Sequence, residues 1–482
     1  MRPERRRPLS ADVGIVGVGF DVYWRQFPRL KTALLKHMDT FERRVAAHGV
    51  TPTNFGIIDN AQVAYDLVPR IKAANLDLLF VDMLTYATSA TFGILIRDLD
   101  MPVVLVALQP RARLDYAHAT IEMQLENDNI CAMPEFAGVA VRMGRRVPPM
   151  IIGTLEGDVR AQAEVAEWCR IARVLHDLKR ARIGHFGHPI EAMLDMHTDQ
   201  TALTATFGLH VVQTELDDLV RLARTVTDAE ISEKEAEILA MFDTPDPVSD
   251  PLTRKLTDVD LRNAAKMAVA LDKFVDAFDL DGLAYYYRGE PGTEREAVAA
   301  NLIVGNSLLC AAGFPMCGES DLKTVVAMLI MDRLEIGGSF AEFHPIDFEE
   351  GFVLVGHDGP HHIAIAEGKP VLRSLTTYHG KPGSGASVEF KIKEGPITML
   401  GITSGPRGFK FVLAEGESVA GPIPATGNTN TRTFFEPDVV TFLKRWLAEG
   451  PTHHFALGVG HHAATIAKIG EILDVETVVV TS

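Results

Sequence analysis

Cysteine and long apolar segments are both scarce in this sequence. Its four cysteines in 482 residues, Cys131, Cys169, Cys310 and Cys317, show no paired spacing. Scattered thiols argue against a disulfide framework and are typical of reduced, buried side chains. No segment offers the roughly 18 charge-free apolar residues of a membrane-spanning helix. We therefore expect a cytoplasmic protein without a membrane partner.

Basic residues are also outnumbered. The chain has 47 Lys and Arg against 64 Asp and Glu, which gives a formal net charge of -17. The only basic run, residues 2–7, precedes a short β-branched segment rather than the long apolar stretch of a signal peptide. Binding to a phosphate backbone needs clustered Lys and Arg, so a nucleic-acid partner is excluded.

The length of the chain predicts more than one domain, because a single compact core does not reach this size. Short β-branched runs alternate with helical patterns in the first third, and a further strand begins near residue 182 after the helical stretch 161–179. This alternation is typical of parallel sheets covered by helices. The first five runs are residues 13–18, 55–58, 78–81, 103–108 and 150–152.

Beyond residue 345 the pattern changes to short strands separated by glycines, which indicates an antiparallel sheet or small barrel. These strands are expected at residues 352–355, 363–365, 388–392, 397–402 and 409–413, with helices at 438–447 and 463–473. The predicted fold is α/β, with two Rossmann-like domains containing parallel sheets, residues 1–180 and 181–345, followed by a mostly antiparallel, barrel-like β domain, residues 346–482.

Gly17 and Gly19 lie at the exit of the first strand and invite comparison with a dinucleotide-binding loop. The third glycine of that fingerprint is missing, and Tyr23 and Trp24 would crowd a pyrophosphate. We therefore do not expect a bound dinucleotide, although loops at strand exits such as this one favour ligand sites.

Two glutamates stand out as candidate catalytic groups. Glu319 precedes an apolar helical run, where Ser320 or Asp321 could equally form an ordinary N-cap and Glu319 could simply complement the helix dipole. Glu342 lies in an apolar setting between aromatic residues, where a carboxylate is costly unless it is paired or bound to a metal.

Histidines follow two of the predicted strands. His357 comes just after residues 352–355, and His461 and His462 follow a glycine-rich strand near the C-terminus. Each could be structural, and the nearby pair at 453 and 454 is expected at the surface. Two carboxylates and two imidazoles form an oxygen and nitrogen set that suits Mn²⁺, with Co²⁺ or Mg²⁺ as alternatives.

These segments resemble the L-arabinose isomerases of the L-fucose and L-arabinose isomerase superfamily. The segment 318–324 is similar to the family's Gly-Glu-x-Asp-x-Lys-Thr motif, and 339–342 to its Ser-Phe-x-Glu motif. The resemblance implies that Glu319 and Glu342 are both metal ligands and the acid-base pair. It further implies His357 and His462 as ligands, with His461 as the fallback.

The resemblance also implies an aldose-ketose isomerase acting on a free sugar, such as L-arabinose or D-galactose, through a cis-enediol. It implies a homo-oligomer, a hexamer or trimer, in which first-domain loops reach the sugar held by a neighbouring subunit. The first-domain loops depart from the family pattern, which affects sugar recognition rather than the metal ligands. The expected substrate-binding residues are Phe20, Asp128, Cys131, Met133, His188, Ile190 and Tyr286.

Two other functions remain open at this point. A bound metal and paired acids also serve a metal-dependent epimerase, lyase or hydrolase acting on a sugar or sugar acid. A sugar-binding homologue without catalysis would keep the fold and leave the ligand residues idle.

Overall fold

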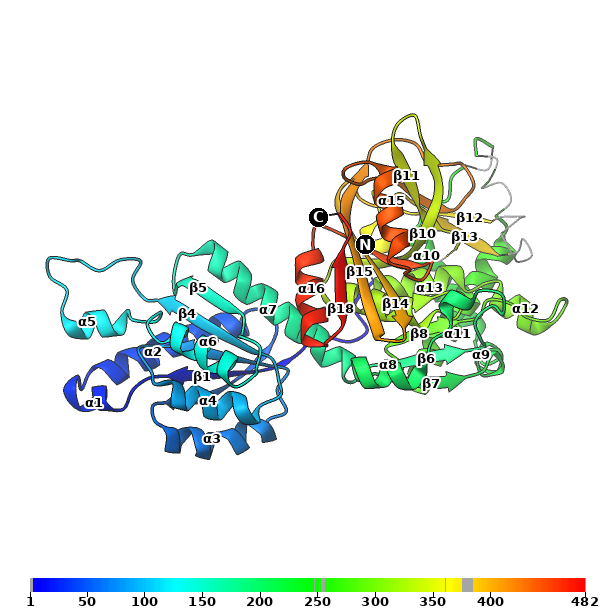
Figure 1. The fold of residues 1–482 in the computed structure, drawn as a ribbon. Coiled ribbons are helices and arrows are strands. Elements are labelled where there is room, and N and C mark those ends of the chain that lie inside the picture. The colour runs from blue at the N-terminus through cyan, green and yellow to red at the C-terminus, as the bar shows by residue number, and fades with distance from the viewer. Residues whose placement is uncertain are drawn as a thin grey trace. The chain divides into compact units, whose positions relative to one another are not determined.

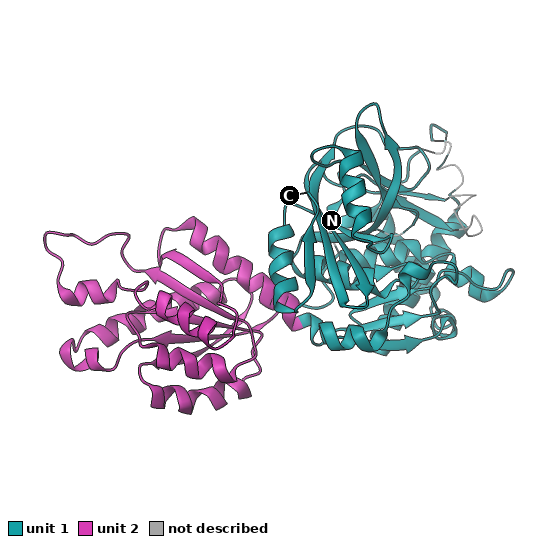
Figure 2. Cartoon of the chain, in the orientation of Figure 1, with its two compact units in different colours: residues 1–8, 177–482 teal, residues 9–176 magenta. Residues whose placement is uncertain are grey.

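The computed structural model describes residues 3–246, 248–250, 252, 256–359, 361–374 and 385–481. The chain forms two compact units, one made of Leu9–His176 and the other of Met1–Pro8 together with Asp177–Ser482 (Figure 2). The chain therefore passes from one unit to the other twice. In the part of the chain that the structure describes, no helix is both long enough and apolar enough to cross a membrane.

The unit of residues 9–176 is built on a parallel five-stranded sheet with the order β2-β1-β3-β4-β5 (Figure 1). Its central strand β3 is buried along its whole length, as expected for a sheet with helices on both faces. The strands are β1 (Asp12–Val18), β2 (Thr51–Ile58), β3 (Leu78–Met83), β4 (Val103–Gln109) and β5 (Met150–Thr154). The helices are α1 (Val22–Gln26), α2 (Leu30–Ala46), α3 (Ala61–Ala73), α4 (Ser89–Asp98), α5 (Ile121–Glu126), α6 (Met133–Arg142) and α7 (Val159–Leu178).

The larger unit contains a second parallel sheet, with the order β7-β6-β8-β9. Its strands are β6 (Arg182–Phe186), β7 (His210–Thr214), β8 (Gly282–Tyr285) and β9 (Met316–Cys317). The helices around it are η1 (Leu194–Met196), α8 (Gln200–Phe207), α9 (Leu216–Ala223), α10 (Asp228–Met241), α11 (Asp258–Phe278), α12 (Glu294–Ala299), α13 (Ile303–Ala311) and α14 (Leu322–Arg333).

The same unit carries an antiparallel barrel. Its strands run in the order β14-β17-β10-β11-β16-β15, and β14 also pairs with β15, which closes the sheet; β18 adds to β15 in parallel. The elements are β10 (Gly337–Asp347), β11 (Phe352–His357), η3 (Ile363–Ile365), β12 (Val371–Ser374), β13 (Ala386–Glu389), β14 (Gly395–Gly405), β15 (Gly408–Val419), β16 (Thr429–Phe434), α15 (Val439–Ala448), β17 (Phe455–Val459), α16 (Ala463–Ile472) and β18 (Glu476–Val479).

This architecture confirms the predicted fold class of two parallel α/β sheets followed by a barrel-like antiparallel sheet. One element differs, because the segment expected as a strand at 363–365 is the 3-10 helix η3. Both of its isoleucines are buried, at 9% and 4% exposure. A single 3-10 turn thus buries the alternating Ile-Ala-Ile pattern, which is also typical of a strand.

Helix α14 connects the two sheets of the larger unit. It contacts β6, β8 and β9 of the parallel sheet and β10, β14 and β17 of the barrel. Every residue of α14 is buried, as expected for a helix that is covered on all sides. The turn that precedes α14 is therefore held between the parallel sheet and the barrel.

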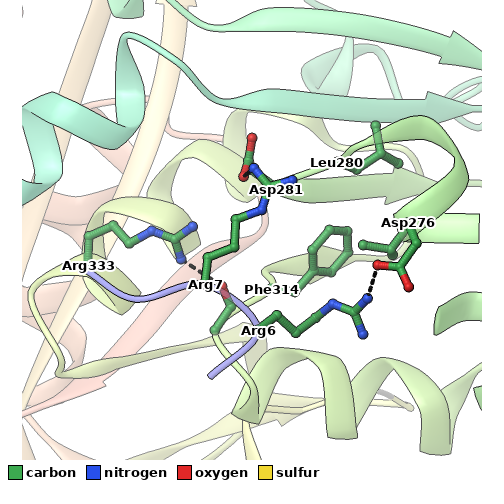
Figure 3. Close-up of a pocket in the computed structure, with 9 residues that line it drawn as sticks. Arg6, Arg7, Asp276, Leu280, Asp281, Phe314 and Arg333 are labelled. Atoms are coloured by element: carbon green, nitrogen blue, oxygen red, sulfur yellow. Dashed lines mark hydrogen bonds and ion pairs between the residues drawn. The ribbon is translucent and has the colours of Figure 1, made fainter. Parts of the chain in front are cut away.

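The basic run near the N-terminus forms ion pairs within the larger unit. Arg5 Nη2 lies 2.6 Å from Asp332 Oδ2, and Arg7 Nη1 lies 2.6 Å from Asp281 Oδ1. Arg6 pairs with acidic residues of α11, one of which is Asp276 (Figure 3). The run thus anchors the N-terminal segment to the surface of this unit.

Candidate metal centre

Three neighbouring barrel strands bring Glu342, His357 and His454 together. Glu342 on β10 lies opposite Gly356, the neighbour of His357 on β11. The residue before Glu342 lies opposite Phe455, which follows His454 at the start of β17. One potential ligand atom from each of the three side chains lies within 4.8 Å of the others, and Nε2 of His357 is 4.0 Å from Oε1 of Glu342.

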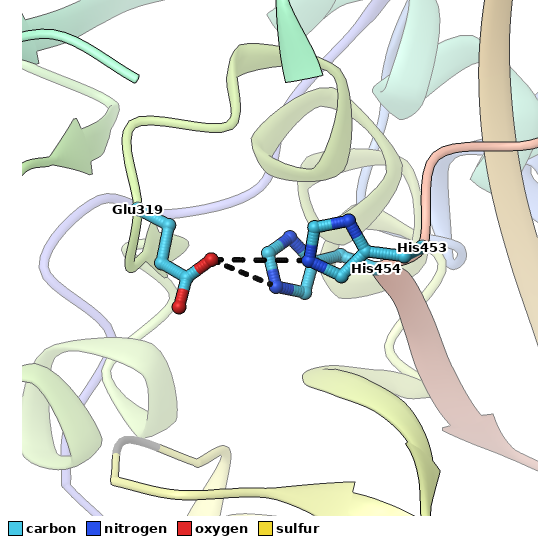
Figure 4. Close-up of side chains that lie close together, drawn as sticks. All are labelled: Glu319, His453 and His454. Atoms are coloured by element: carbon cyan, nitrogen blue, oxygen red, sulfur yellow. Dashed lines mark ion pairs between the residues drawn. The ribbon is translucent and has the colours of Figure 1, made fainter. Parts of the chain in front are cut away.

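Glu319 approaches the same cluster from the turn between β9 and α14. Its Oε2 lies 3.5 Å from Nε2 of His454 and 3.8 Å from Nε2 of His453, and both imidazoles point toward this carboxylate (Figure 4). His454 is therefore common to two groups of three potential ligands, one with Glu319 and His453 and one with Glu342 and His357.

The turn that carries Glu319 has an unusual backbone. Glu319 and Ser320 have φ values of 61° and 59°, in the left-handed region that residues other than glycine rarely adopt. Surrounding contacts hold this conformation, because Ser320 donates its N–H to the carbonyl of Tyr285 and its hydroxyl to the carbonyl of Phe186. The turn is thereby fixed to the ends of β8 and β6, and Glu319 is directed toward the histidines.

The two buried histidines are oriented by hydrogen bonds at Nδ1. Nδ1 of His454 donates to Oδ2 of Asp321 at 3.2 Å, and Nδ1 of His357 donates to the carbonyl of Asp358 at 3.0 Å. Phe340 packs against both rings, with ring-centroid distances of 4.4 and 4.2 Å. The proton of each ring is thus on Nδ1, and each Nε2 keeps its lone pair for the cluster, as is usual for metal-binding histidines.

The acidic side chains of the cluster are held in their ionised form. Burial raises the pKa of Glu342, but the hydrogen bond from His344 and the neighbouring imidazoles of His357 and His454 outweigh it and lower this pKa to about 2. Burial also raises the pKa of Glu319, but the neighbouring histidines outweigh it and this pKa lies below its ordinary value. Burial in turn lowers the pKa of His357, which favours the neutral, metal-binding form of this imidazole.

A second layer of polar groups supports the site. Nδ1 of His453 lies 2.6 Å from Oδ2 of Asp195. Burial lowers the pKa of His453, but the carboxylates of Glu319 and Asp195 outweigh it and raise this pKa to about 9. The ammonium group of Lys323 donates to three carbonyls of residues 195–197, which fixes the loop that carries Asp195. Ring nitrogens of His344 contact Oε1 of Glu342 and the side chain of Asn430.

The cluster contains Glu319, Glu342 and His357 from the predicted ligand set, whereas His461 and His462 lie elsewhere. His461 is near the carbonyl of Gly416 and half exposed, and His462 is the N-cap residue of α16. These two follow β17, whereas His454 precedes it. Four steps of about 3.3 Å along the strand separate its ends by about 13 Å.

His454 was expected at the surface, and that expectation is wrong. Its side chain is 0% exposed and lies among Phe340, Glu319 and Asp321. A histidine pair stands at each end of β17, so residue types alone do not choose between the pairs. The antiparallel register of β10 and β17 decides, because it places residue 454 beside residue 342.

The candidate sugar-binding residues of the smaller unit lie just after β1 and between α5 and the start of α6. Phe20 packs edge to face against Tyr23 and Tyr86, at ring-centroid distances of 5.4 and 6.0 Å. Burial raises the pKa of Tyr23, and the nearby ionisable groups of Asp128, Tyr86 and Cys131 raise it further, so these groups are neighbours. Met133 lies apart from them in the core, 2% exposed, where it has almost no surface to offer to a ligand.

The candidates of the larger unit follow β6 and β8. His188 is exposed and its ring packs against Tyr286 at a centroid distance of 4.6 Å, while Ile190 is half-buried. The charge of Glu319 contributes to a raised pKa of Tyr287, although burial is the larger cause. These aromatic side chains and His188 follow the carboxyl ends of β6 and β8, at the same edge of the sheet as Glu319, which follows β9.

Comparisons with known proteins show which proteins the chain is similar to. Residues 337–476 match the model of the L-arabinose isomerase C-terminal domain. The L-arabinose isomerase of Nocardioides sp. is 28% identical over 397 residues, 78% of this chain and 75% of that protein. The chain is an L-arabinose isomerase-like protein. Similarity to the L-arabinose isomerase of Escherichia coli strain K12 is 22% over 393 residues, 79% of this chain and 76% of that protein.

The matched domain contains most of the cluster of this L-arabinose isomerase-like protein. Glu342, His357 and both histidine pairs fall inside residues 337–476, whereas Glu319 precedes that segment. The site therefore combines a domain characteristic of the family with a turn contributed by the central part of the chain.

Proposed function

We propose that the protein is a metal-dependent aldose-ketose isomerase that acts on a free sugar. The coarser part of this proposal, an isomerase of sugars, is supported by the relatives, which are named L-arabinose isomerases. The main support for a bound metal is that Glu319, Glu342, His357 and His454 lie close together. The imidazole of His454 belongs to both groups of three potential ligands. We retain Mn²⁺ as the proposed ion, with Co²⁺ and Mg²⁺ as alternatives.

The residues present fit a divalent ion. Oε2 of Glu319 and Nε2 of His454 are buried and have no hydrogen-bond partner among the described residues, although they lie 3.5 Å apart. Two such atoms are costly to bury unless something binds both of them. Carboxylate oxygens and imidazole nitrogens are ligands that Mn²⁺ and similar ions accept.

When bound, the ion would polarise the sugar carbonyl and hold two adjacent oxygens. Glu319 and Glu342 would move the proton between neighbouring carbons by way of a cis-enediol, one as base and the other as acid. Both carboxylates are ionised in the ion-free protein, so either is able to accept the first proton. Phe340 and the fully buried His454 exclude water from one side of the cluster.

The sugar would enter beside the aromatic groups that follow β6 and β8. His188 and Tyr286 offer a ring nitrogen and a hydroxyl to sugar hydroxyls. L-arabinose and D-galactose remain the proposed substrates, the first because the relatives are named for it. We further propose a cytoplasmic homo-oligomer, a hexamer or trimer, in which the loops around Phe20 and Asp128 complete the sugar site of a neighbouring subunit.

The experiment is a ketose assay over a panel of aldoses with Mn²⁺, together with proton exchange in deuterated water. An isomerase should form ketose and carry solvent deuterium into C1 or C2 of the sugar. Glu319→Gln and Glu342→Gln should each abolish ketose formation while the protein stays folded.

The two open alternatives give different outcomes in this experiment. An epimerase or lyase would convert the sugar without a ketose product. A sugar-binding homologue would bind sugars equally well with and without Mn²⁺ and show no turnover, which would overturn the proposal.

A further inference from the structure

A cavity of about 390 Å³ lies within the unit of residues 9–176, between α2 and α7. This volume falls in the range of small-molecule sites, about 300–1,000 Å³. None of its lining residues belongs to the metal cluster, and the proposed isomerase activity makes no use of it. The cavity is lined by Arg44, Ala47, His48, Leu108, Thr154, Ala161, Gln162 and Val165.

One fixed positive charge, that of Arg44, lines the cavity. Its lining contains Arg44 and His48 and, among the described residues, no carboxylate. The pKa of His48 is lowered by burial and by the positive charges of Arg170 and Arg173, which lie on α7 and add to the same field. His48 is therefore held mainly neutral, where its ring N–H can still donate, and the charge of Arg44 favours an anionic ligand.

Two acidic side chains contact the lining residues without cancelling the charge of Arg44. Glu156 is 76% exposed and its Oε1 lies 4.0 Å from Nη2 of Arg44, so the pair is weak. The carboxylate of Asp158 accepts the N–H groups of Thr154 and Ala161 and thereby caps the start of α7. Arg44 consequently keeps most of its capacity to bind an anion.

The remaining lining defines the rest of the ligand. Thr154 and Gln162 supply a hydroxyl and an amide for hydrogen bonds, and four side chains form an apolar wall. The apolar residues are Ala47, Leu108, Ala161 and Val165. A compact molecule with one strongly anionic end and a short polar body matches this combination.

We propose that the cavity binds a small phosphate monoester, with Arg44 and His48 on the phosphate and Thr154 and Gln162 on the hydroxyls of its body. Arginine is the side chain best suited to phosphate, because its planar donors bind two oxygens at once. The ligand would occupy this site independently of the metal cluster, whose residues all belong to the other unit.

The test is calorimetric titration of the full-length protein with glycerol 3-phosphate, inorganic phosphate and glycerate. We expect saturable binding of glycerol 3-phosphate, with a Kd raised about tenfold or more by Arg44→Gln or His48→Gln. The matched control is Arg43→Gln, one residue away on α2, where Arg43 is exposed and donates to Thr40. This control should change Kd by about twofold at most.

Several outcomes would overturn the proposal. They are an absence of saturable binding, equal binding by the Arg44→Gln and His48→Gln variants, and glycerate binding as tight as that of glycerol 3-phosphate. Glu319→Gln separates this proposal from the isomerase proposal, because it removes a metal ligand and should leave the binding of glycerol 3-phosphate unchanged. Loss of binding in Glu319→Gln would assign the phosphate to the metal centre and refute the cavity site.

Discussion

Replacing His454 with glutamine should remove the metal from the cluster, whereas the same change at His462 should not. His454 is the only side chain that belongs to both groups of potential ligands at the site, so its loss separates Glu319 from Glu342 and His357. Loss of a group that hydrogen-bonds a metal ligand typically weakens metal binding about 10- to 100-fold, and loss of the ligand itself should exceed that. We expect the Kd for Mn²⁺ to rise about 100-fold or more, which corresponds to at least about 2.8 kcal/mol.

The measurement is calorimetric titration with Mn²⁺ of protein first stripped by chelator. His462→Gln is the matched control, because it makes the same chemical change at the other end of β17, and its Kd should stay within about twofold of the unmodified protein. Circular dichroism establishes that both variants are folded. If His462→Gln loses the ion and His454→Gln keeps it, the derivation of the cluster from the register of β10 and β17 is refuted.

Three further substitutions each remove the charge of a buried aspartate. Asp321→Asn keeps the N-cap of α14 but removes the charge that orients His454. The Mn²⁺ affinity, measured by titration, should therefore fall about 10- to 100-fold. An unchanged affinity would contradict this role of Asp321. Asp332→Asn removes one of the two carboxylates that pair with the buried Arg333, the other being Asp177, and should cost about 3 kcal/mol in urea unfolding, whereas a loss below about 1 kcal/mol would show that this pair is dispensable. Burial alone raises the pKa of Asp82 from 3.8 to about 7, so ionisation destabilises the fold and stability should fall as the pH rises from about 4 to 7. Asp82→Asn should remove this slope and stabilise the protein at pH 8 by up to about 4 kcal/mol, and equal slopes in both proteins would refute the cause.

Local patterns were sufficient to predict the fold. Runs of β-branched residues locate the strands of the first sheet, because a strand buried on both faces must be apolar throughout. Beyond residue 345, short strands separated by glycines indicate the antiparallel barrel. The segment 363–365 shows the limit of this approach, because three residues are too few to separate a strand from a 3-10 turn when both bury the same isoleucines.

The candidate site was only partly predictable for a different reason. Glu319, Glu342 and His357 belong to motifs whose residue types carry chemistry, so they stand out in the sequence. His454 precedes a strand that has another histidine pair at its far end, and only the pairing of that strand with β10 distinguishes the two pairs. The buried Asp321–His454 hydrogen bond likewise depends on contacts between residues 133 positions apart.

The double passage of the chain between its units makes residues 9–176 an insertion in the sequence of the larger unit. Both sides of the insertion point are tied to adjacent residues at the end of α14, because Arg5 binds Asp332 and Arg333 binds Asp177. These two ion pairs hold the segments that flank the insertion, and neither pair involves a residue of the inserted segment. A short linker from Pro8 to Asp177 should therefore yield a minimal scaffold that retains all the proposed metal ligands, onto which other sugar-recognition modules can be grafted.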